Sequence, residues 1–118
     1  RGIGVDQDFI EATKWYRLAA EQGNVLAANR LAWLMAVCPV KEVCDGNVAL
    51  EFAALAVQKE RSATNLDSLA AAYARVGDFD RALQVINEVL DDESLSSSTR
   101  EKYARRNDRY NNGIPFQL

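Results

Sequence analysis

The stretch Gly77-Asp78-Phe79-Asp80-Arg81-Ala82-Leu83 lies at the centre of the pattern that decides the fold of this chain. Ala82 opens a run of the form Ala-x-x-apolar-apolar-x-x-apolar-apolar, and the same run begins at Ala12 and Ala49, with separations of 37 and 33 residues. Because its apolar positions are spaced by three and four residues, the run indicates one side of an amphipathic helix. The sequence therefore predicts three copies of one helix type.

A second pattern lies between these copies. Leu66-x-x-Leu69-Ala70-x-x-Tyr73 has a counterpart that begins at Ala28, 38 residues earlier, and a fainter one that begins at Tyr103, 37 residues later. The two patterns alternate along the chain, and no segment is typical of a strand. We expect helices near 7–22, 25–36, 46–60, 63–76, 79–91 and 99–110.

The residues at the expected helix ends agree with these periods. Asp45 and Asp78 each stand four residues before the small anchor of a helix, where a side-chain oxygen can accept hydrogen bonds from the first turn. Gly23 and Gly77 each follow a helical run and favour the left-handed conformation that ends a helix. Ser98, with Glu101 three residues later, is interpreted as a capping box for the last helix.

The small residues in both patterns predict how the helices pack. Alanine allows two helix axes to approach closely, and a large residue of the next helix fills the groove. A helical pair of this length cannot cover its own apolar face, so each pair needs a neighbour. We expect an all-α fold, a right-handed α-α solenoid of about six antiparallel helices.

Two known repeat families resemble parts of the chain. Residues 63–96, with Gly77-Asp78-Phe79-Asp80-Arg81-Ala82-Leu83, resemble the tetratricopeptide motif, except that Ser94 stands where the motif often has proline. Residues 1–24, from Gly2-x-Gly4 to Gln22-Gly23-Asn24, resemble the second half of a Sel-one-like repeat. Since residue 1 is Arg and the helix before Gly2 is missing, we expect the chain to be a piece of a longer protein.

The rest of the chain fits the same resemblance. Residues 25–62 resemble a divergent tetratricopeptide unit of bacterial repeat proteins with an extended loop at 37–44, and residues 97–118 look like a closing helix and tail. The resemblance implies a single helical-repeat domain over 1–118. It also implies a scaffold or adaptor that binds a protein or peptide and is not an enzyme.

Composition excludes several other classes of function. The 118 residues are 48% hydrophobic, carry a net charge of −3 and contain no His. Such a chain lacks the positive charge of a nucleic-acid binder and the usual general base and metal ligand. It has no apolar run long enough to span a membrane and no glycine-rich phosphate loop. We expect no cofactor, no metal, no nucleic-acid partner and no membrane insertion.

The resemblance also implies a binding face. In these families the first helix of each repeat lines the concave surface, and the corresponding positions here include Ala36, Val37 and Ala74. Chaperone-tail-binding members carry Lys and Asn where this chain has Asp67 and Ala71, so a carboxylate clamp at these two positions is not expected. The residues expected to bind the partner are Asn29, Trp33, Asp67, Ala71 and Arg75.

Two of these residues have a second interpretation. Trp33 is an aromatic anchor for the partner, or it packs under the loop of residues 38–44. Arg75 contributes to the binding face and pairs loosely with Asp67 along the same helix, or both side chains are solvated.

Two further features remain open. Cys38 and Cys44 are six residues apart, which is neither a redox motif nor a zinc site, so they form a disulfide in an oxidising compartment or stay as thiols. Lys102, Arg106 and Arg109 fall on one face of the last helix and form a patch for an acidic partner, or they are simply solvated.

Three hypotheses follow for the role of the chain. The first is a protein-interaction module that binds its partner on the concave face. The second is self-association of the chain as a homo-oligomer through an uncovered first helix that bears Phe9, Ile10 and Trp15. The third, a catalyst based on the two thiols, needs a thiol of lowered pKa. The sequence does not assign a compartment.

Overall fold

A computed structural model describes residues 2–37 and 45–115 of the chain, and within these residues it consists of six helices without a strand. The expected all-α class is confirmed. The first helix begins at Gly2 and not near residue 7, so the two glycines at its start do not delay it. The helices are α1 (Gly2–Glu21), α2 (Val25–Val37), α3 (Gly46–Lys59), α4 (Ala63–Arg75), α5 (Phe79–Leu90) and α6 (Ser97–Asn111).

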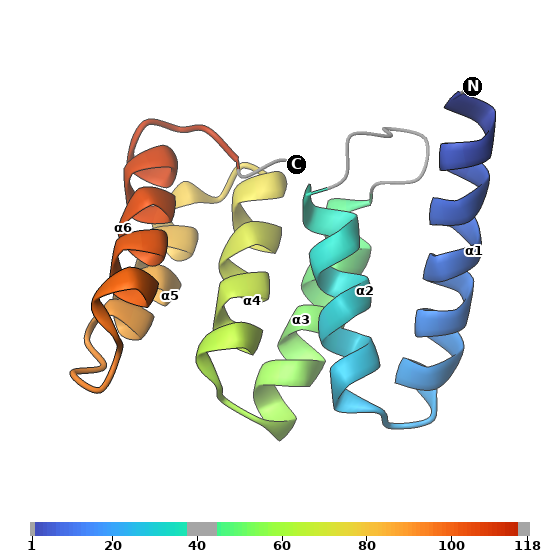
Figure 1. Cartoon of the computed structure of the whole chain (residues 1–118), viewed down its shortest axis with the longest axis horizontal. Coiled ribbons are helices and arrows are strands. Elements are labelled where there is room, and N and C mark those ends of the chain that lie inside the picture. Colours follow the sequence, from blue (N-terminus) through green and yellow to red (C-terminus); the bar gives the residue numbers. More distant parts are fainter. Residues whose placement is uncertain (1, 38–44, 116–118) are drawn as a thin grey trace.

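Neighbouring helices run antiparallel along the row that they form (Figure 1). α2 packs against α1, α3 and α4, and α5 packs against both α4 and α6. In the view of Figure 1, α2, α4 and α6 lie in front of α3 and α5. The helices of the second sequence pattern therefore form one face of the described molecule.

The helix ends follow two of the expected signals closely. The Asp45 carboxylate accepts hydrogen bonds from the backbone N–H groups of Asn47 and Val48, at 2.9 and 3.3 Å. Gly23 and Gly77 have φ values of 95° and 88°, the left-handed conformation that glycine adopts without strain. Each expected stop is therefore present.

The capping box expected at Ser98 and Glu101 is wrong. α6 begins at Ser97, and Ser96 caps it, because its hydroxyl oxygen accepts a hydrogen bond from the Thr99 N–H at 3.2 Å. Glu101 instead accepts a hydrogen bond from Arg105, one turn further along the helix. Ser96 is two residues earlier in the same serine run, which offers the same chemistry.

Asp78 provides a test of the capping argument, since its carboxylate accepts a hydrogen bond from the Arg81 N–H at 3.2 Å at the start of α5. Asp78→Ala is expected to destabilise the chain by about 1 kcal/mol, because one amide of the first turn loses its acceptor. Asp78→Asn, which keeps a side-chain oxygen, is expected to lose only a fraction of that. Urea unfolding followed by circular dichroism measures both. Equal losses for the two variants would show that the charge, and not the cap, is what matters.

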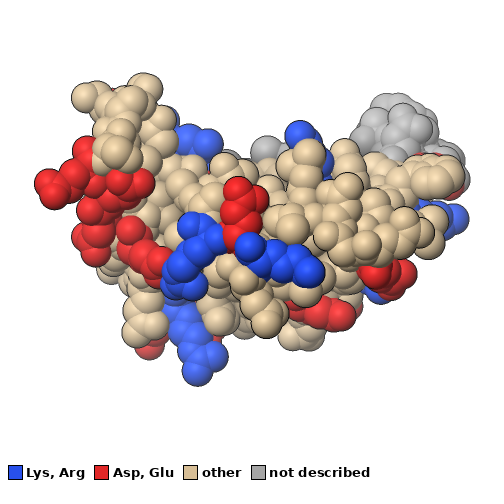
Figure 2. Space-filling view, turned by 90° about the horizontal axis from the view of Figure 1, so that it is seen from below, with Lys and Arg blue, Asp and Glu red and all other residues tan. Residues whose placement is uncertain are grey.

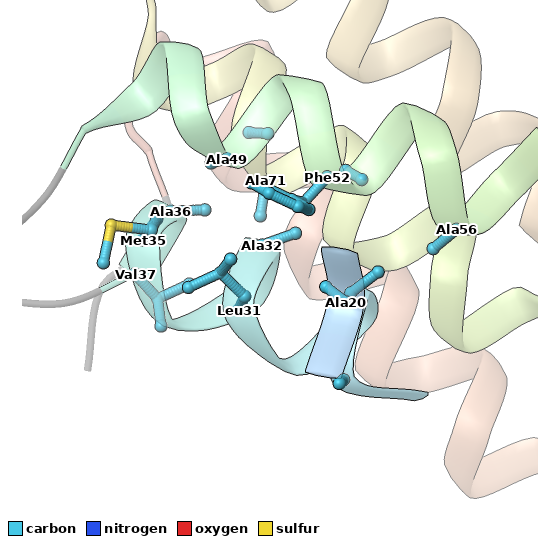
Figure 3. Packing of buried hydrophobic residues seen from close by; sticks show 14 residues of the cluster. Ala20, Leu31, Ala32, Met35, Ala36, Val37, Ala49, Phe52, Ala56 and Ala71 are labelled. Atoms are coloured by element: carbon cyan, nitrogen blue, oxygen red, sulfur yellow. The ribbon is translucent and has the colours of Figure 1, made fainter. Parts of the chain in front are cut away.

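Buried alanines hold the helices close together, as the sequence pattern predicts. Ala32 and Ala36 of α2 and Ala49 and Ala53 of α3 are completely buried, as is Ala82 of α5. Figure 3 shows Ala32 of α2 and Phe52 of α3 between their two helices. This core continues through α4 into a second cluster between α4, α5 and α6. The packing fixes how α2, α4 and α6 stand relative to one another.

None of the described helices is both long and apolar enough to cross a lipid bilayer.

Candidate functional site

A half-open pocket of about 370 Å³ lies on the face of α2, α4 and α6 and also touches α1. Three of the expected partner-binding residues line it, namely Asn29, Trp33 and Asp67. Two residues of the expected basic patch, Lys102 and Arg106, line it as well. Residues that the sequence placed in two separate sites therefore come together in one.

The floor of this pocket is a buried ion pair between α4 and α6. The Arg106 guanidinium donates from Nε and Nη2 to the two carboxylate oxygens of Asp67, at 2.6 and 3.0 Å, and each side chain is only 8% exposed. Burial raises the pKa of the Asp67 carboxyl, and the charges of Arg106 and Lys102 oppose this rise. The two-point geometry fixes both planar groups and leaves them nearly neutral as a unit.

Trp33 forms a wall of the pocket. Its side chain is half-buried, and the Arg106 guanidinium carbon lies 5.2 Å from the centre of its ring. The same guanidinium lies 5.8 Å from the ring of Tyr103. The cation–π contact with Trp33 joins α2 to the ion pair of α4 and α6, and the one with Tyr103 lies within α6. Trp33 is thus held in place and still presents part of its ring to the pocket.

Asn29 is also held by its surroundings. It is buried, and its side-chain oxygen accepts a hydrogen bond from the Ser68 hydroxyl of α4. Both residues line the pocket, together with Thr64 one turn earlier on α4. The polar part of the pocket is therefore built between two helices whose relative position the core fixes, which is the arrangement expected of a preorganised site.

The other residues expected on the concave face lie elsewhere. Ala71 and Ala74 are buried in the core, as are Ala36 and Val37 of α2, because these positions face the neighbouring helices. Arg75 is half-buried and lies outside the pocket lining, where its guanidinium donates to the Ala36 carbonyl oxygen at 3.5 Å. Of the positions carried over from the family, Asn29, Trp33 and Asp67 therefore line the pocket, and the others do not.

Asp67 does not pair with Arg75, and this expectation is wrong. Its partner is Arg106, 39 residues away on another helix. A sequence signal for this pair does exist. In the second repeat pattern Arg106 takes the place held by Leu31 and Leu69 in the other two copies, so a charge falls at a core position. Such a charge requires a buried partner, and Asp67 is a carboxylate in the preceding copy of the same pattern.

The side chains of the basic patch expected on the last helix do not form one surface. Arg106 faces inward to Asp67, and Arg109 donates to the Pro115 carbonyl oxygen at 2.8 Å. Arg100 donates to the carbonyl oxygens of Leu90 and Asp92 and so covers the end of α5. Of the three patch residues, Lys102 alone is exposed and borders the pocket.

Acidic residues gather at the end of the molecule formed by α5 and α6, seen from below in Figure 2, while Lys and Arg lie across the middle of that view. The run Asp91-Asp92-Glu93 follows α5 and is exposed. Asp92 accepts hydrogen bonds from the Ser94 N–H and hydroxyl at 2.9 and 2.7 Å, which lower its pKa. This run is a solvated turn.

Some of the predicted residues lie outside the described part of the chain. These are Cys38 and Cys44, with the disulfide that was weighed for them, and the loop under which Trp33 was alternatively expected to pack. The side chain of Phe9 is likewise not described. Ile10 is half-buried, and Trp15 is 67% exposed on α1.

No protein-family model, curated protein or solved structure matches this chain.

Proposed function

We propose that this chain is a non-catalytic protein-interaction module whose pocket between α2, α4 and α6 holds a segment of a partner protein or a peptide. In this proposal the six helices are a right-handed solenoid of Sel-one-like and tetratricopeptide-like repeats, and the pocket lies on its concave side. The alternation of two helix types supports this arrangement, because α2, α4 and α6 all carry the second pattern and share one face.

The observation that carries the proposal is the way Trp33 and the Asp67–Arg106 pair are fixed around an open hollow. An aromatic side chain that is already ordered loses little conformational entropy on binding, and such residues dominate protein interfaces. A volume of about 370 Å³ is near the lower end of the range for ligand pockets, about 300–1,000 Å³. The pocket therefore accommodates the anchoring side chains of a partner and not a whole domain.

The groups in the pocket favour binding over catalysis. Thr64, Ser68 and Tyr16 supply its hydroxyls. The Ser68 hydroxyl donates to the Asn29 amide oxygen, and an amide is too weak a base to activate a nucleophile. The Asp67 carboxylate is fully engaged by Arg106. The lining thus supplies aromatic surface, hydrogen bonds and positive charge, which recognise a ligand without transforming it.

Removal of the aromatic wall tests the proposal. Peptides selected on the intact chain from a displayed random library are expected to bind Trp33→Ala at least about tenfold more weakly, since truncating a central aromatic anchor typically costs more than 1 kcal/mol. Leu18→Ala, which truncates a 53% exposed side chain outside the pocket, is the control and is expected to leave affinity unchanged. Isothermal calorimetry measures affinity, and circular dichroism verifies that each variant is folded.

Two results would refute the proposal. One is a selection that enriches no peptide above the level found with an unrelated helical protein. The other is a set of selected peptides that bind folded Trp33→Ala and the unchanged chain with the same Kd.

A second candidate function is self-association, favoured by the apolar residues on the surface of α1 and the start of α2. Trp15, Leu18 and Leu26 are 67%, 53% and 60% exposed. Exposed apolar groups of this size gain free energy when another surface covers them. Sedimentation at increasing concentration tests this function, which requires a dimer that Trp15→Ala weakens.

A further inference from the structure

A second hollow continues the pocket toward α1. Its volume is about 310 Å³, and it shares Tyr16, Leu26 and Arg30 with the first. Beyond these shared residues it reaches Trp15. Together the two hollows form a groove that leads from Lys102 on α6, across α2, to the exposed indole on α1.

The two parts of this groove differ in character. Trp15 at the α1 end and Leu26 in the part shared by the two hollows are 67% and 60% exposed, so both offer apolar surface to a ligand. Toward the middle and the α6 end stand Arg30 and Lys102, which are exposed and take part in none of the ion pairs between described residues. The groove is therefore apolar at Trp15, combines Leu26 with the positive charge of Arg30 in its middle, and is cationic at Lys102.

The charge of the groove is opposite in sign to that of the whole chain. Among the described residues that line the two hollows, Asp67 is the one acidic residue, and Arg106 neutralises it. Arg30 and Lys102 then leave this groove positive on a chain of net charge −3. A positive groove on an acidic protein selects for a negatively charged ligand and disfavours a basic one.

We propose that the groove recognises a peptide segment in which a carboxylate side chain lies near a large apolar side chain. This inference rests on the proposed function. Arg30 and Lys102 bind the carboxylate, and Trp15 and Leu26 cover the apolar group. Trp33 and the Asp67–Arg106 pair form the rigid wall and floor between the two subsites. This recognition differs from a carboxylate clamp at positions 67 and 71, because its cations come from α2 and α6.

A displayed random-peptide library selected on the intact chain tests the specificity. The enriched sequences, synthesised with blocked termini, are expected to combine Asp or Glu with Phe, Trp, Leu or Ile. Arg30→Glu and Lys102→Glu are each expected to weaken their binding at least about tenfold, and added salt weakens binding to the unchanged chain. Trp15→Ala is expected to remove the preference for an apolar residue while the preference for an acidic one remains.

The matched control is Lys14→Glu, which makes the same change of charge at a 67% exposed side chain that lines neither hollow. It is expected to change affinity by less than about twofold. A loss equal to that of the two groove variants would overturn the inference, since net charge alone would then explain it. Enriched peptides without acidic residues would also overturn it, while leaving the proposed function intact if they require Trp33.

Two further outcomes separate the inference from the function on which it rests. If no peptide is enriched, the proposed function fails and the inference fails with it. If the unchanged chain dimerises and Trp15→Ala abolishes the dimer, a second copy covers the apolar end. The two-part recognition is then overturned, although binding in the Trp33 pocket stands.

Discussion

Asp67→Ala is expected to destabilise the chain by about 3–5 kcal/mol, because the Arg106 guanidinium is then left buried without its counter-charge. The carboxylate accepts two hydrogen bonds, at 2.6 and 3.0 Å, and the side chains of both partners are only 8% exposed. Such a loss is a large fraction of the stability of a domain of this size. Chemical unfolding with guanidinium chloride, monitored by circular dichroism, measures the change.

The chain contains a matched control for this prediction. Arg61 and Glu88 also form a two-point pair, with both N···O distances at 2.6 Å, but their side chains are 60% and 42% exposed. Glu88→Ala is expected to cost much less, since water solvates the remaining guanidinium. Similar losses for Asp67→Ala and Glu88→Ala would contradict the argument that burial makes the Asp67–Arg106 pair important.

Removing the other partner gives the first prediction a pH dependence. In Arg106→Met the Asp67 carboxyl stays buried without its main opposing charge, so its pKa in the folded chain rises further above the unfolded value. A carboxyl with a raised folded pKa contributes stability at low pH, and this contribution is lost as pH rises through that pKa. The stability lost in Arg106→Met, relative to the unchanged chain, is therefore expected to be smaller at about pH 5 than at about pH 7.5. A loss that does not depend on pH would contradict the assignment of Asp67 as the group left unpaired.

Local signals in the sequence were sufficient for most of the fold. Asp78, Gly77 and the alanine pattern act within one or two helical turns, so the sequence predicts their roles directly. The cap of α6 was misplaced because Ser96 and Ser98 offer the same side-chain oxygen, and the contacts that set the start of the helix are not local. Helix starts are in general the least determined part of such a prediction.

The site was predicted only in part, because it depends on how the helices are rotated about their axes. Asn29, Trp33 and Asp67 lie in the pocket, but Ala71 on α4 turns into the core. A position along a helix does not by itself say which neighbour a side chain faces. The pairing of Asp67 with Arg106 joins residues 39 positions apart, and periodicity alone cannot choose such a partner.

Ala53→Leu tests the claim that alanine sets the spacing of the helices. Ala53 is completely buried and belongs to the core between α1, α2, α3 and α4. Leucine adds three carbon atoms where no space exists, which is expected to cost about 1–3 kcal/mol through shifted side chains and backbone. The next residue, Ala54, is exposed on the same helix, so Ala54→Leu makes the same change of residue without this crowding.

Ala54→Leu is expected to change stability by no more than about 0.5 kcal/mol, since alanine and leucine have similar helix propensities and the new side chain meets water. Urea midpoints of the two variants give the comparison. Equal and small changes would mean that α3 can move away from its neighbours at little cost. In that case the alanine pattern would not fix α2 and α4, and the pocket built between them would lose the rigidity on which its role as a binding site depends.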